Sequence, residues 1–378
     1  MIGFRALYLT DNPTLGGTIR ILQSWLLLGR DQQIVQGHVV IRPGSEFRRW
    51  LDTHHIPYTF NPLPEPSKTR PWDALWHAAR LSAWARRRGI QVIHCNEHNI
   101  YPFGAFLRRL LPLPLVCHIR YRVEREYCAW AFGPGREPDA LLWTSEQQRA
   151  DCEQAIRGIV PEARQHLIPL GVDPAVFGHQ VEARETMRHQ WGIQPGEIVI
   201  GQATALRPRK RIEDFIDLVA TLAQHDSRIV GVLAGDAPPG DEPYRDVVRQ
   251  RIEASGLGRR FQWLGNLDDV EPFDQAIDVF VSTSVYETFG NSVCEAMACG
   301  RPIVAYRGGS VQEVVGDGGI VVDNEDVAGL VRAVRETVTQ PGLRDSLGEK
   351  ARRRVQNVYS PAATLKRLAG IYGALVAR

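Results

Sequence analysis

Short runs of β-branched and apolar residues alternate with helical patterns along almost the whole chain of 378 residues, and this alternation most constrains its fold. Strands that are separated by helices form parallel sheets, because the chain must cross over a face of the sheet between them. In the first half the pattern predicts strands at 4–9, 37–41, 92–95, 115–118, 140–143 and 166–168. In the second half it predicts strands at 198–203, 229–234, 261–264, 279–282, 303–306 and 320–322. An α/β protein is therefore expected.

Two doubly wound domains are the predicted architecture. The chain is long enough for two hydrophobic cores, and polar residues follow Gly171-Val-Asp-Pro at the end of the last strand of the first half. We place the first domain at 1–180, the second at 181–360, and a C-terminal helix that returns to the first domain at 361–378. Ligands bind beyond the carboxyl ends of strands in open parallel sheets, so we expect the site in a cleft where two such sheets face each other.

The composition is that of a soluble globular protein, with 44% hydrophobic and 23% charged residues. No apolar run approaches the roughly 20 residues of a membrane span. A predicted strand begins at Phe4, so we expect no signal peptide. None of the six cysteines forms a Cys-x-x-Cys pair, which favours reduced thiols in a core over a zinc site. Reduced thiols in turn favour a cytoplasmic location.

The net charge of +2 is unevenly distributed. Residues 1–180 hold 21 Lys and Arg against 16 Asp and Glu, whereas the rest holds 24 against 27. A basic first half is consistent with an anionic acceptor, with peripheral contact to the inner face of a membrane, or with solvated helix faces such as Arg86-Arg87-Arg88. Nucleic acid is not an expected partner, because no basic stripe is interleaved with aromatic residues. The first half is also rich in tryptophan, at positions 25, 50, 72, 76 and 84.

The segment 279–300 has the clearest chemical content. A buried strand leads into a loop that carries Glu287, and a helix that opens near Asn291 carries Glu295. The loop brings the backbone amides of Phe289-Gly290 to a helix N-terminus, a favourable place for phosphate or sugar oxygens. Ionised carboxylates accept hydrogen bonds from sugar hydroxyls. The alternative is that both acids only stabilise the helix dipole.

Glu287-Thr-Phe-Gly-Asn-Ser-Val-Cys-Glu295 resembles the E-x7-E motif of the retaining glycosyltransferases of family 4, which have the GT-B fold of two Rossmann-like domains facing each other across a cleft. The resemblance extends from about residue 261 to residue 323 and includes Arg307-Gly-Gly-Ser310. It implies that Glu287 contacts the donor sugar, that the amides of Phe289 and Gly290, next to Asn291 at the helix start, bind sugar oxygens, and that Glu295 receives the ribose.

Two weaker similarities lie in the first half. Leu15-Gly16-Gly17-Thr18 resembles the family's first glycine loop, and adjacent glycines allow the backbone to approach the donor phosphates closely. Cys117-His118-Ile-Arg120 resembles the segment with the family's strand-end histidine, which lies near the reacting sugar. His118 is therefore a candidate catalytic residue, although a single histidine is often structural.

The segment Ala203-Thr-Ala-Leu-Arg207-Pro-Arg209-Lys210-Arg211 departs from the family pattern. The family usually has an arginine and, five or six residues later, a lysine that together bind the diphosphate. Lys210 matches the lysine and is a candidate catalytic and phosphate-binding residue, but Thr204 or Ala205 stands where the arginine belongs. Arg207 and Arg209 are candidates to supply the missing charge from a shifted position; a solvated basic loop is the alternative.

The resemblance implies transfer of a glycosyl group, with retained anomeric configuration, from a UDP- or GDP-linked sugar to a glycan, a lipid-linked sugar or a small molecule. It implies no metal and no other cofactor. Cationic groups and amides would stabilise the charge that develops on the leaving diphosphate. A sugar-nucleotide epimerase of the same fold and a binding protein without turnover remain as alternatives. A dehydrogenase is disfavoured, because no G-x-G-x-x-G follows a strand.

Overall fold

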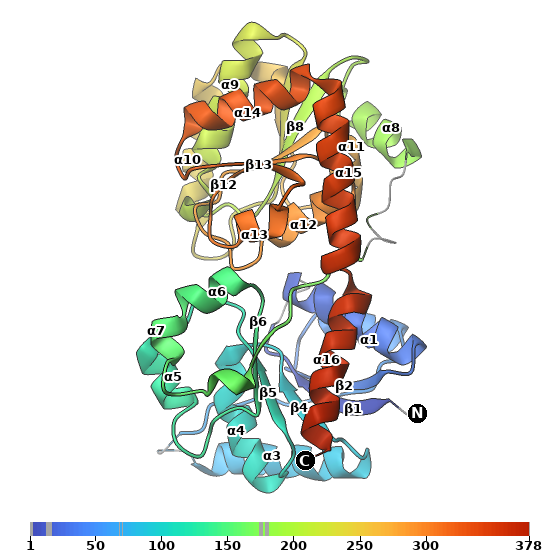
Figure 1. Ribbon diagram of the computed structural model, residues 1–378, viewed down its shortest axis with the longest axis vertical. Coiled ribbons are helices and arrows are strands. Elements are labelled where there is room, and N and C mark those ends of the chain that lie inside the picture. The colour runs from blue at the N-terminus through green and yellow to red at the C-terminus, as the bar shows by residue number, and fades with distance from the viewer. Residues whose placement is uncertain are drawn as a thin grey trace. The chain divides into compact units, whose positions relative to one another are not determined.

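The computed structural model describes residues 3–12, 17–67, 69, 71–173, 177 and 181–377, which form two compact units. The first unit ends at Gly171 and resumes at Pro361, and the second comprises Val172–Ser360. Figure 1 colours the first unit from blue to green, with the C-terminal helix in red. At the change of unit, Gly171 lies against Pro361 of the first unit, and Val172 N donates to Tyr359 O of the second unit at 2.8 Å.

The first unit is built on a seven-stranded parallel sheet in the order β3-β2-β1-β4-β5-β6-β7. In this described part of the chain the strands are β1 (Phe4–Leu9), β2 (Val35–Ile41), β3 (Tyr58–Phe60), β4 (Val92–Cys95), β5 (Leu115–His118), β6 (Ala140–Trp143) and β7 (Gln165–Leu167). Leu9 lies opposite Cys95, and Cys95 lies opposite Cys117. The carboxyl ends of the three central strands are therefore level.

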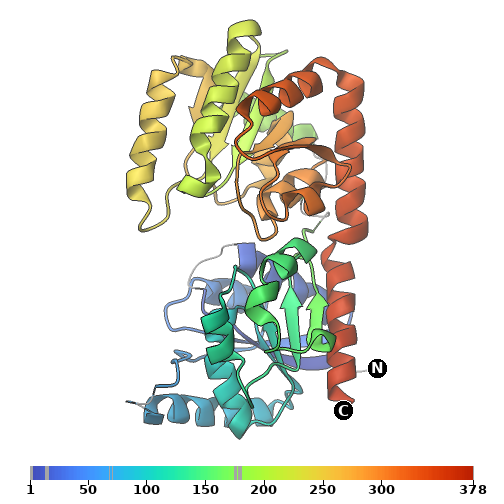
Figure 2. The same ribbon diagram turned by 60° about the vertical axis from the view of Figure 1, so that its left-hand side comes forward.

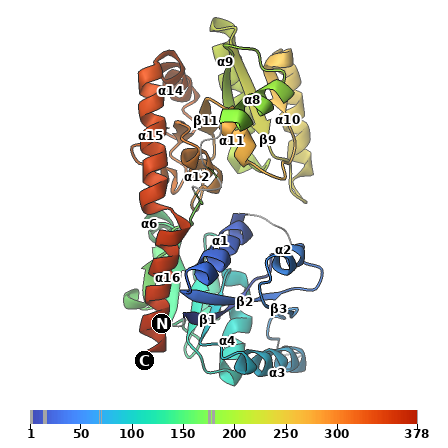
Figure 3. The same ribbon diagram turned by 90° about the vertical axis from the view of Figure 1, so that its right-hand side faces the viewer.

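Helices cover both faces of this sheet. They are α1 (Gly17–Asp31), α2 (Phe47–Thr53), α3 (Pro71–Arg87), α4 (Tyr101–Leu110), α5 (Arg125–Ala131), α6 (Glu146–Asp151), α7 (Glu153–Ile156) and α16 (Pro361–Val376). Figures 1 and 3 show α16 beside α1, and Trp25 Nε1 donates to Thr364 Oγ1 at 3.0 Å. The end of the chain is thus fastened to the first unit.

The second unit is built on a six-stranded parallel sheet in the order β10-β9-β8-β11-β12-β13. Its described strands are β8 (Ile198–Ala203), β9 (Ile229–Ala234), β10 (Phe261–Trp263), β11 (Val279–Ser282), β12 (Ile303–Tyr306) and β13 (Gly319–Val322). All residues of β8, β9, β11 and β12 are buried, as expected for strands with helices on both faces.

Two helical layers enclose the second sheet. The helices are α8 (Val181–Gln190), α9 (Ile212–His225), α10 (Glu242–Ala254), α11 (Glu271–Ala276), α12 (Asn291–Ala298), α13 (Val311–Val315), α14 (Val327–Thr339) and α15 (Pro341–Val358). Helices α9, α10 and α14 cover one face, and α8, α11, α12 and α15 cover the other (Figures 2 and 3). Ile212, Phe215 and Val219 recur at helical spacing and turn one side of α9 into the core.

The α/β fold class is confirmed, and twelve of the thirteen strands in the described residues lie within two residues of their predicted bounds. The prediction missed β3, which has only three residues and is followed by the proline-rich stretch from Pro62. All six cysteines are free and buried, as predicted. Within the described residues, every helix is too short or too polar to cross a membrane.

Candidate active site

Two loops at the carboxyl end of the second sheet are bonded to each other. β8 and β11 are neighbours in this sheet, so the loops that follow them start side by side. Val285 N donates to Arg209 O at 3.0 Å, and Thr283 Oγ1 donates to Lys210 O at 2.7 Å. Backbone pairing thus continues beyond the strands, and it brings Lys210 next to the loop of Glu287.

The side chains of Lys210 and Glu287 form an ion pair in this place. They are only 9% and 14% exposed. Burial raises the pKa of the Glu287 carboxyl, but the charge of Lys210 and hydrogen bonds from Lys210 and Ser284 outweigh burial and hold the pKa below its ordinary value. The Glu287 carboxylate is therefore ionised at neutral pH, and it has a partner for its charge.

Two glycines after β12 allow a third loop to close on the backbone of Glu287. A Cβ on Gly308 would lie 2.0 Å from the carbonyl oxygen of Ser284, and one on Gly309 would lie 2.4 Å from that of Glu287. Gly309 also has a φ of +60°. Glu287 N donates to Gly308 O at 3.2 Å, and Ser310 N donates to Glu287 O at 2.9 Å. The position of Glu287 is therefore fixed by backbone bonds on both sides.

Helix α12 begins directly after the loop, with Gly290 at its N-cap in a left-handed conformation (φ +91°). The first amides of a helix lack intrahelical acceptors and lie at the positive end of its dipole. The ring of Phe289 is buried and packs edge to face on Tyr359, with ring centroids 5.4 Å apart. Among the described residues, Asn291 Oδ1 is a buried atom without a hydrogen-bond partner. The helix start therefore offers amides and one unsatisfied acceptor.

Glu295 lies about one turn inside α12 and is partly exposed. Its neighbour Asp274 on α11, which the sequence did not indicate, is wholly buried. Burial and then the charge of Glu295 raise the pKa of Asp274 well above its ordinary value. Burial beside Glu295 therefore favours the uncharged form of Asp274.

The cations between Arg207 and Arg211 differ in their surroundings. Arg207 is exposed, and its Nε lies 3.4 Å from the carboxylate of Asp241. Arg209 is also exposed and donates from Nη1 to Tyr286 O at 3.3 Å. Within this described segment only Lys210 is buried. Neither arginine occupies a buried position equivalent to that of the lysine.

A second polar cluster lies at the carboxyl ends of β1, β4 and β5 in the first unit. Glu97 accepts hydrogen bonds from Thr10 Oγ1 and Asn96 Nδ2, both at 2.9 Å. Arg120 donates to Asn96 O at 2.8 Å and to Asn96 Oδ1 at 2.7 Å. Burial raises the pKa of Glu97, although the charge of Arg120 opposes it, and burial lowers the pKa of Arg120 to about 10. The sequence had given no role to Glu97 or to Arg120, although Arg120 lies in the segment that resembles the family's histidine segment.

His118 ends β5 and is wholly buried, with its ring stacked on Trp25 at 6.0 Å between centroids. Burial, followed by the positive charge of Arg120, lowers its pKa well below the ordinary value, so the imidazole is neutral. Neither ring nitrogen finds a hydrogen-bond partner among the residues that the structure describes. Of the predicted glycine loop, Gly17 begins α1, whereas Gly16 lies outside the described residues.

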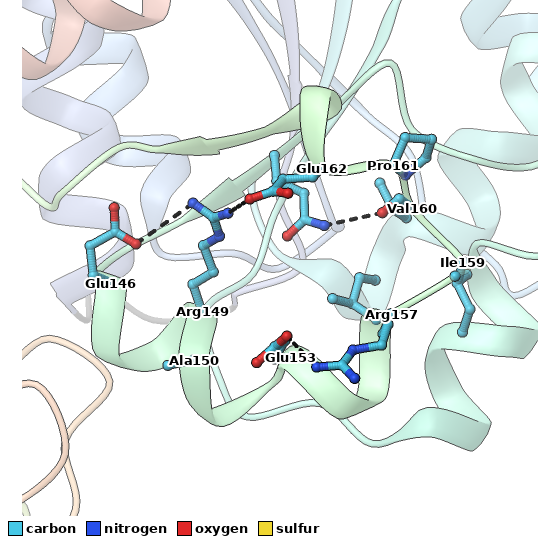
Figure 4. A pocket seen from close by; sticks show the side chains of 12 residues that line it. Glu146, Arg149, Ala150, Glu153, Arg157, Ile159, Val160, Pro161 and Glu162 are labelled. Atoms are coloured by element: carbon cyan, nitrogen blue, oxygen red, sulfur yellow. Dashed lines mark hydrogen bonds and ion pairs between the residues drawn. The ribbon is translucent and has the colours of Figure 1, made fainter.

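A pocket of about 560 Å³ in the first unit contains none of the predicted residues (Figure 4). Its charged side chains are paired with one another: Arg149 lies 3.7 Å from Glu146 and 2.6 Å from Glu162. Arg157 is paired with Glu153. Because both arginines are already in ion pairs, this pocket is a poor site for a phosphate. The candidate site is therefore the one at the strand ends.

Two family models match consecutive parts of the chain. The model described as "Glycosyltransferase Family 4" matches residues 35–176, and the one described as "Glycosyl transferases group 1" matches residues 183–354. Residues 1–34, which include β1 and α1, residues 177–182, and residues 355–378, which include α16, lie outside both matches. The chain belongs to glycosyltransferase family 4, and the predicted class of enzyme, a glycosyltransferase, is confirmed.

Several curated glycosyltransferases are similar to the chain. It is 28% identical over 316 residues to the lipopolysaccharide core biosynthesis mannosyltransferase LpcC of Rhizobium leguminosarum bv. viciae, which covers 83% of this chain and 86% of the relative. It is 26% identical over 311 residues to the GDP-mannose-dependent alpha-(1-6)-phosphatidylinositol dimannoside mannosyltransferase of Mycobacterium tuberculosis (strain ATCC 25177 / H37Ra), which covers 77% and 74%.

Solved structures of low sequence identity share the fold. The structure of Anabaena HepE in complex with UDP has a TM-score of 0.85 at 22% identity and covers 98% of this chain and 100% of its own. WaaG, a glycosyltransferase involved in lipopolysaccharide biosynthesis, has a TM-score of 0.68 at 16% identity and covers 98% and 99%. The predicted GT-B fold is thereby confirmed.

Proposed function

We propose that this chain is a retaining glycosyltransferase that moves a sugar from a UDP- or GDP-linked donor to an acceptor. The mycobacterial relative is named as GDP-mannose-dependent, and HepE was crystallised with UDP and with UDP-glucose. The relative LpcC acts in lipopolysaccharide core biosynthesis, which favours a glycan or lipid-linked sugar over a small molecule as acceptor. The basic balance of residues 1–180 is compatible with an anionic acceptor of this kind.

The buried pair of Lys210 and Glu287 supports the proposal most strongly. A buried carboxylate next to a helix N-terminus can accept hydrogen bonds from sugar hydroxyls, and the amides of Phe289 and Gly290 can donate to sugar oxygens, while the ammonium of Lys210 faces phosphate oxygens. Glu295, one turn further, would receive the ribose hydroxyls. The roles of the two acids follow the resemblance of the E-x7-E segment, and the ionised state of Glu287 agrees with its role as an acceptor.

In the proposed reaction, the bond between the anomeric carbon and the diphosphate oxygen breaks, and a bond from an acceptor oxygen to the same carbon forms. The proton of the acceptor hydroxyl passes to the leaving diphosphate or to water. Lys210 and the amides at the start of α12 stabilise the negative charge that develops on the leaving oxygen. We assign Glu287 a binding role and not that of a covalent nucleophile, because its carboxylate is already engaged in an ion pair with Lys210.

His118 is proposed as a further contributor from the first unit. A neutral imidazole offers one donor and one acceptor, and a buried polar group without a partner is costly unless a ligand or water satisfies it. Its position at the end of β5 is where ligands of parallel sheets bind. We propose that it bonds a hydroxyl of the reacting sugar.

A screen of donor hydrolysis and transfer over UDP-, GDP-, ADP- and TDP-sugars tests the proposal. We expect turnover with at least one UDP- or GDP-sugar, about 100-fold or more loss in Lys210→Ala, and weaker donor binding in Glu295→Ala. Arg228→Ala, which removes an exposed ion pair with Asp226, is the matched control. A rearranged free sugar without acceptor would identify an epimerase. Donor binding that raises the Tm without any turnover would identify a binding protein.

A further inference from the structure

Helix α3 turns mostly small side chains inward and exposes two of its three tryptophans. Its buried side packs against α4 with Ala74, Ala78, Leu81 and Ala85. On the opposite side Trp72 is 76% exposed, Trp76 55% and Leu75 36%. A helix that only covers a core has the reverse distribution, with the large apolar residues inside. The exposed face therefore has the character of a contact surface.

Arginines follow these exposed residues along the helix. The guanidinium of Arg80 lies over the Trp76 ring at 4.5 Å, and that of Arg88 lies over Trp84 at 4.0 Å. Arg86 and Arg87 are exposed at the end of the helix. Asp73 is the single acid between residues 71 and 88, which leaves this segment a net charge of +3. The face is thus both aromatic and cationic.

Large exposed apolar side chains are unevenly shared between the two units. Among the described residues, the first unit has six of them and the second has one, Val247. Figures 1 and 3 show α3 at an outer edge of the first unit, with α4 on its inner side. The face of α3 is therefore available to a partner that is large compared with the helix.

An apolar groove of about 430 Å³ adjoins the segment that leads into α3. Pro66 and Ser67 from that segment form part of its wall, together with Phe106 and the exposed Trp130. Arg109 lines the same groove. The combination of aromatic side chains with a cation thus continues from the helix to its neighbourhood.

We propose that the α3 face, defined as Trp72, Leu75, Trp76 and Arg80, docks on the surface of an anionic lipid bilayer. Tryptophan is enriched where hydrocarbon meets water, and arginine stems lie along apolar surface while their heads reach phosphate. A cationic segment next to apolar side chains is attracted by anionic headgroups. The opposite side of α3 remains packed on α4, so the helix lies in the plane of the interface. This inference concerns where the enzyme works and does not depend on the donor.

Co-sedimentation of the full chain with lipid vesicles tests the proposal. We expect binding to phosphatidylcholine vesicles that contain phosphatidylglycerol, weaker binding to phosphatidylcholine alone, and weakening by salt. Trp72→Ser/Trp76→Ser should reduce the partition coefficient about ten-fold or more. Arg86→Gln/Arg87→Gln should reduce it about five-fold for each charge at low salt. Val247→Ser, which removes the exposed apolar side chain of the second unit, should change nothing.

The tryptophan variant must keep the Tm and the donor hydrolysis of the wild type, which shows that the site in the second unit is intact. Equal vesicle binding by wild type and double variant would overturn the proposal, as would failure of the wild type to bind anionic vesicles at low salt. A wild-type dimer in solution that the double variant dissolves would assign the face to a second copy of the chain instead. Failure of donor turnover would leave the vesicle result unaffected, so the two proposals fail separately.

Discussion

The two units have the same parallel α/β architecture but build their strand ends in opposite ways. In the second unit the loops after β8, β11 and β12 are joined by backbone hydrogen bonds, and the charge of Glu287 is matched by Lys210. In the first unit His118 and Arg120 keep nitrogens that no described residue satisfies. A site whose loops are bonded to one another and whose buried charge is paired suits a constant ligand such as a nucleoside diphosphate. Buried ring and guanidinium nitrogens without a partner favour a ligand that the chain itself does not supply.

The largest effect that tests this comparison is expected at the Lys210–Glu287 pair. Lys210→Ala leaves the Glu287 carboxylate buried without a partner, which we expect to cost about 3 kcal/mol or more of unfolding free energy together with activity. Lys210→Met/Glu287→Gln removes both charges, so we expect it to recover much of the stability but none of the turnover. Thermal denaturation and donor hydrolysis of the three proteins separate the two roles. Recovery of activity in the double variant would mean that the pair is only structural.

The second largest effect is expected in the third loop of the second unit, which contains Gly308 and Gly309. Gly309→Ala places a Cβ at φ +60° and 2.4 Å from the Glu287 carbonyl oxygen, so we expect a loss of about 2 kcal/mol or more and weaker donor binding. Gly342→Ala is the matched control, because nothing lies within 4 Å of its Cβ position. Calorimetric titration with donor and thermal melts of both variants provide the measurement. If both variants bound donor equally, the third loop would not be what holds Glu287.

The sequence predicts features that are contiguous in the chain, but not side-chain partners that lie far apart in it. Strands that are buried on both faces appear as short apolar runs, and the E-x7-E segment is contiguous, so both were predictable. The partners Lys210 and Glu287 are 77 residues apart, and only the adjacency of β8 and β11 brings them together. Asp274 gave no signal, because an acid on a short helix is usually exposed.

The α3 face shows most clearly what the sequence alone could not predict. The helix carries apolar residues on two sides, Ala74 and Ala78 on one and Trp72 and Trp76 on the other, so periodicity alone does not decide which side is buried. The close approach of α4 favours the small residues inside. Packing, and not hydrophobicity, therefore decided the orientation.

The buried histidine of the first unit gives a pH-dependent prediction. The pKa of His118 is lowered by folding, so the unfolded chain binds a proton at higher pH than the folded one, and stability is lost as pH falls below about 6.5. In His118→Phe, which retains a ring to stack on Trp25, we expect the loss between about pH 6.5 and 5 to be smaller by about 2 kcal/mol. Urea denaturation at several pH values measures it. An unchanged pH dependence would indicate that His118 takes up its proton at the same pH in the folded and in the unfolded chain.

The smallest effect on stability is expected at Arg207. This variant tests whether Arg207 takes part in binding the donor diphosphate. Its pair with Asp241 is exposed and 3.4 Å long, so Arg207→Ala should change the unfolding free energy by less than about 0.5 kcal/mol. If Arg207 replaces the family's missing diphosphate arginine, the donor Kd should nevertheless rise about ten-fold, because a charge-assisted bond to phosphate is lost. Arg251→Ala, which removes another exposed pair with Asp217, should leave the Kd unchanged. An equal Kd in wild type and Arg207→Ala would leave Lys210 and the amides of α12 to hold the diphosphate by themselves.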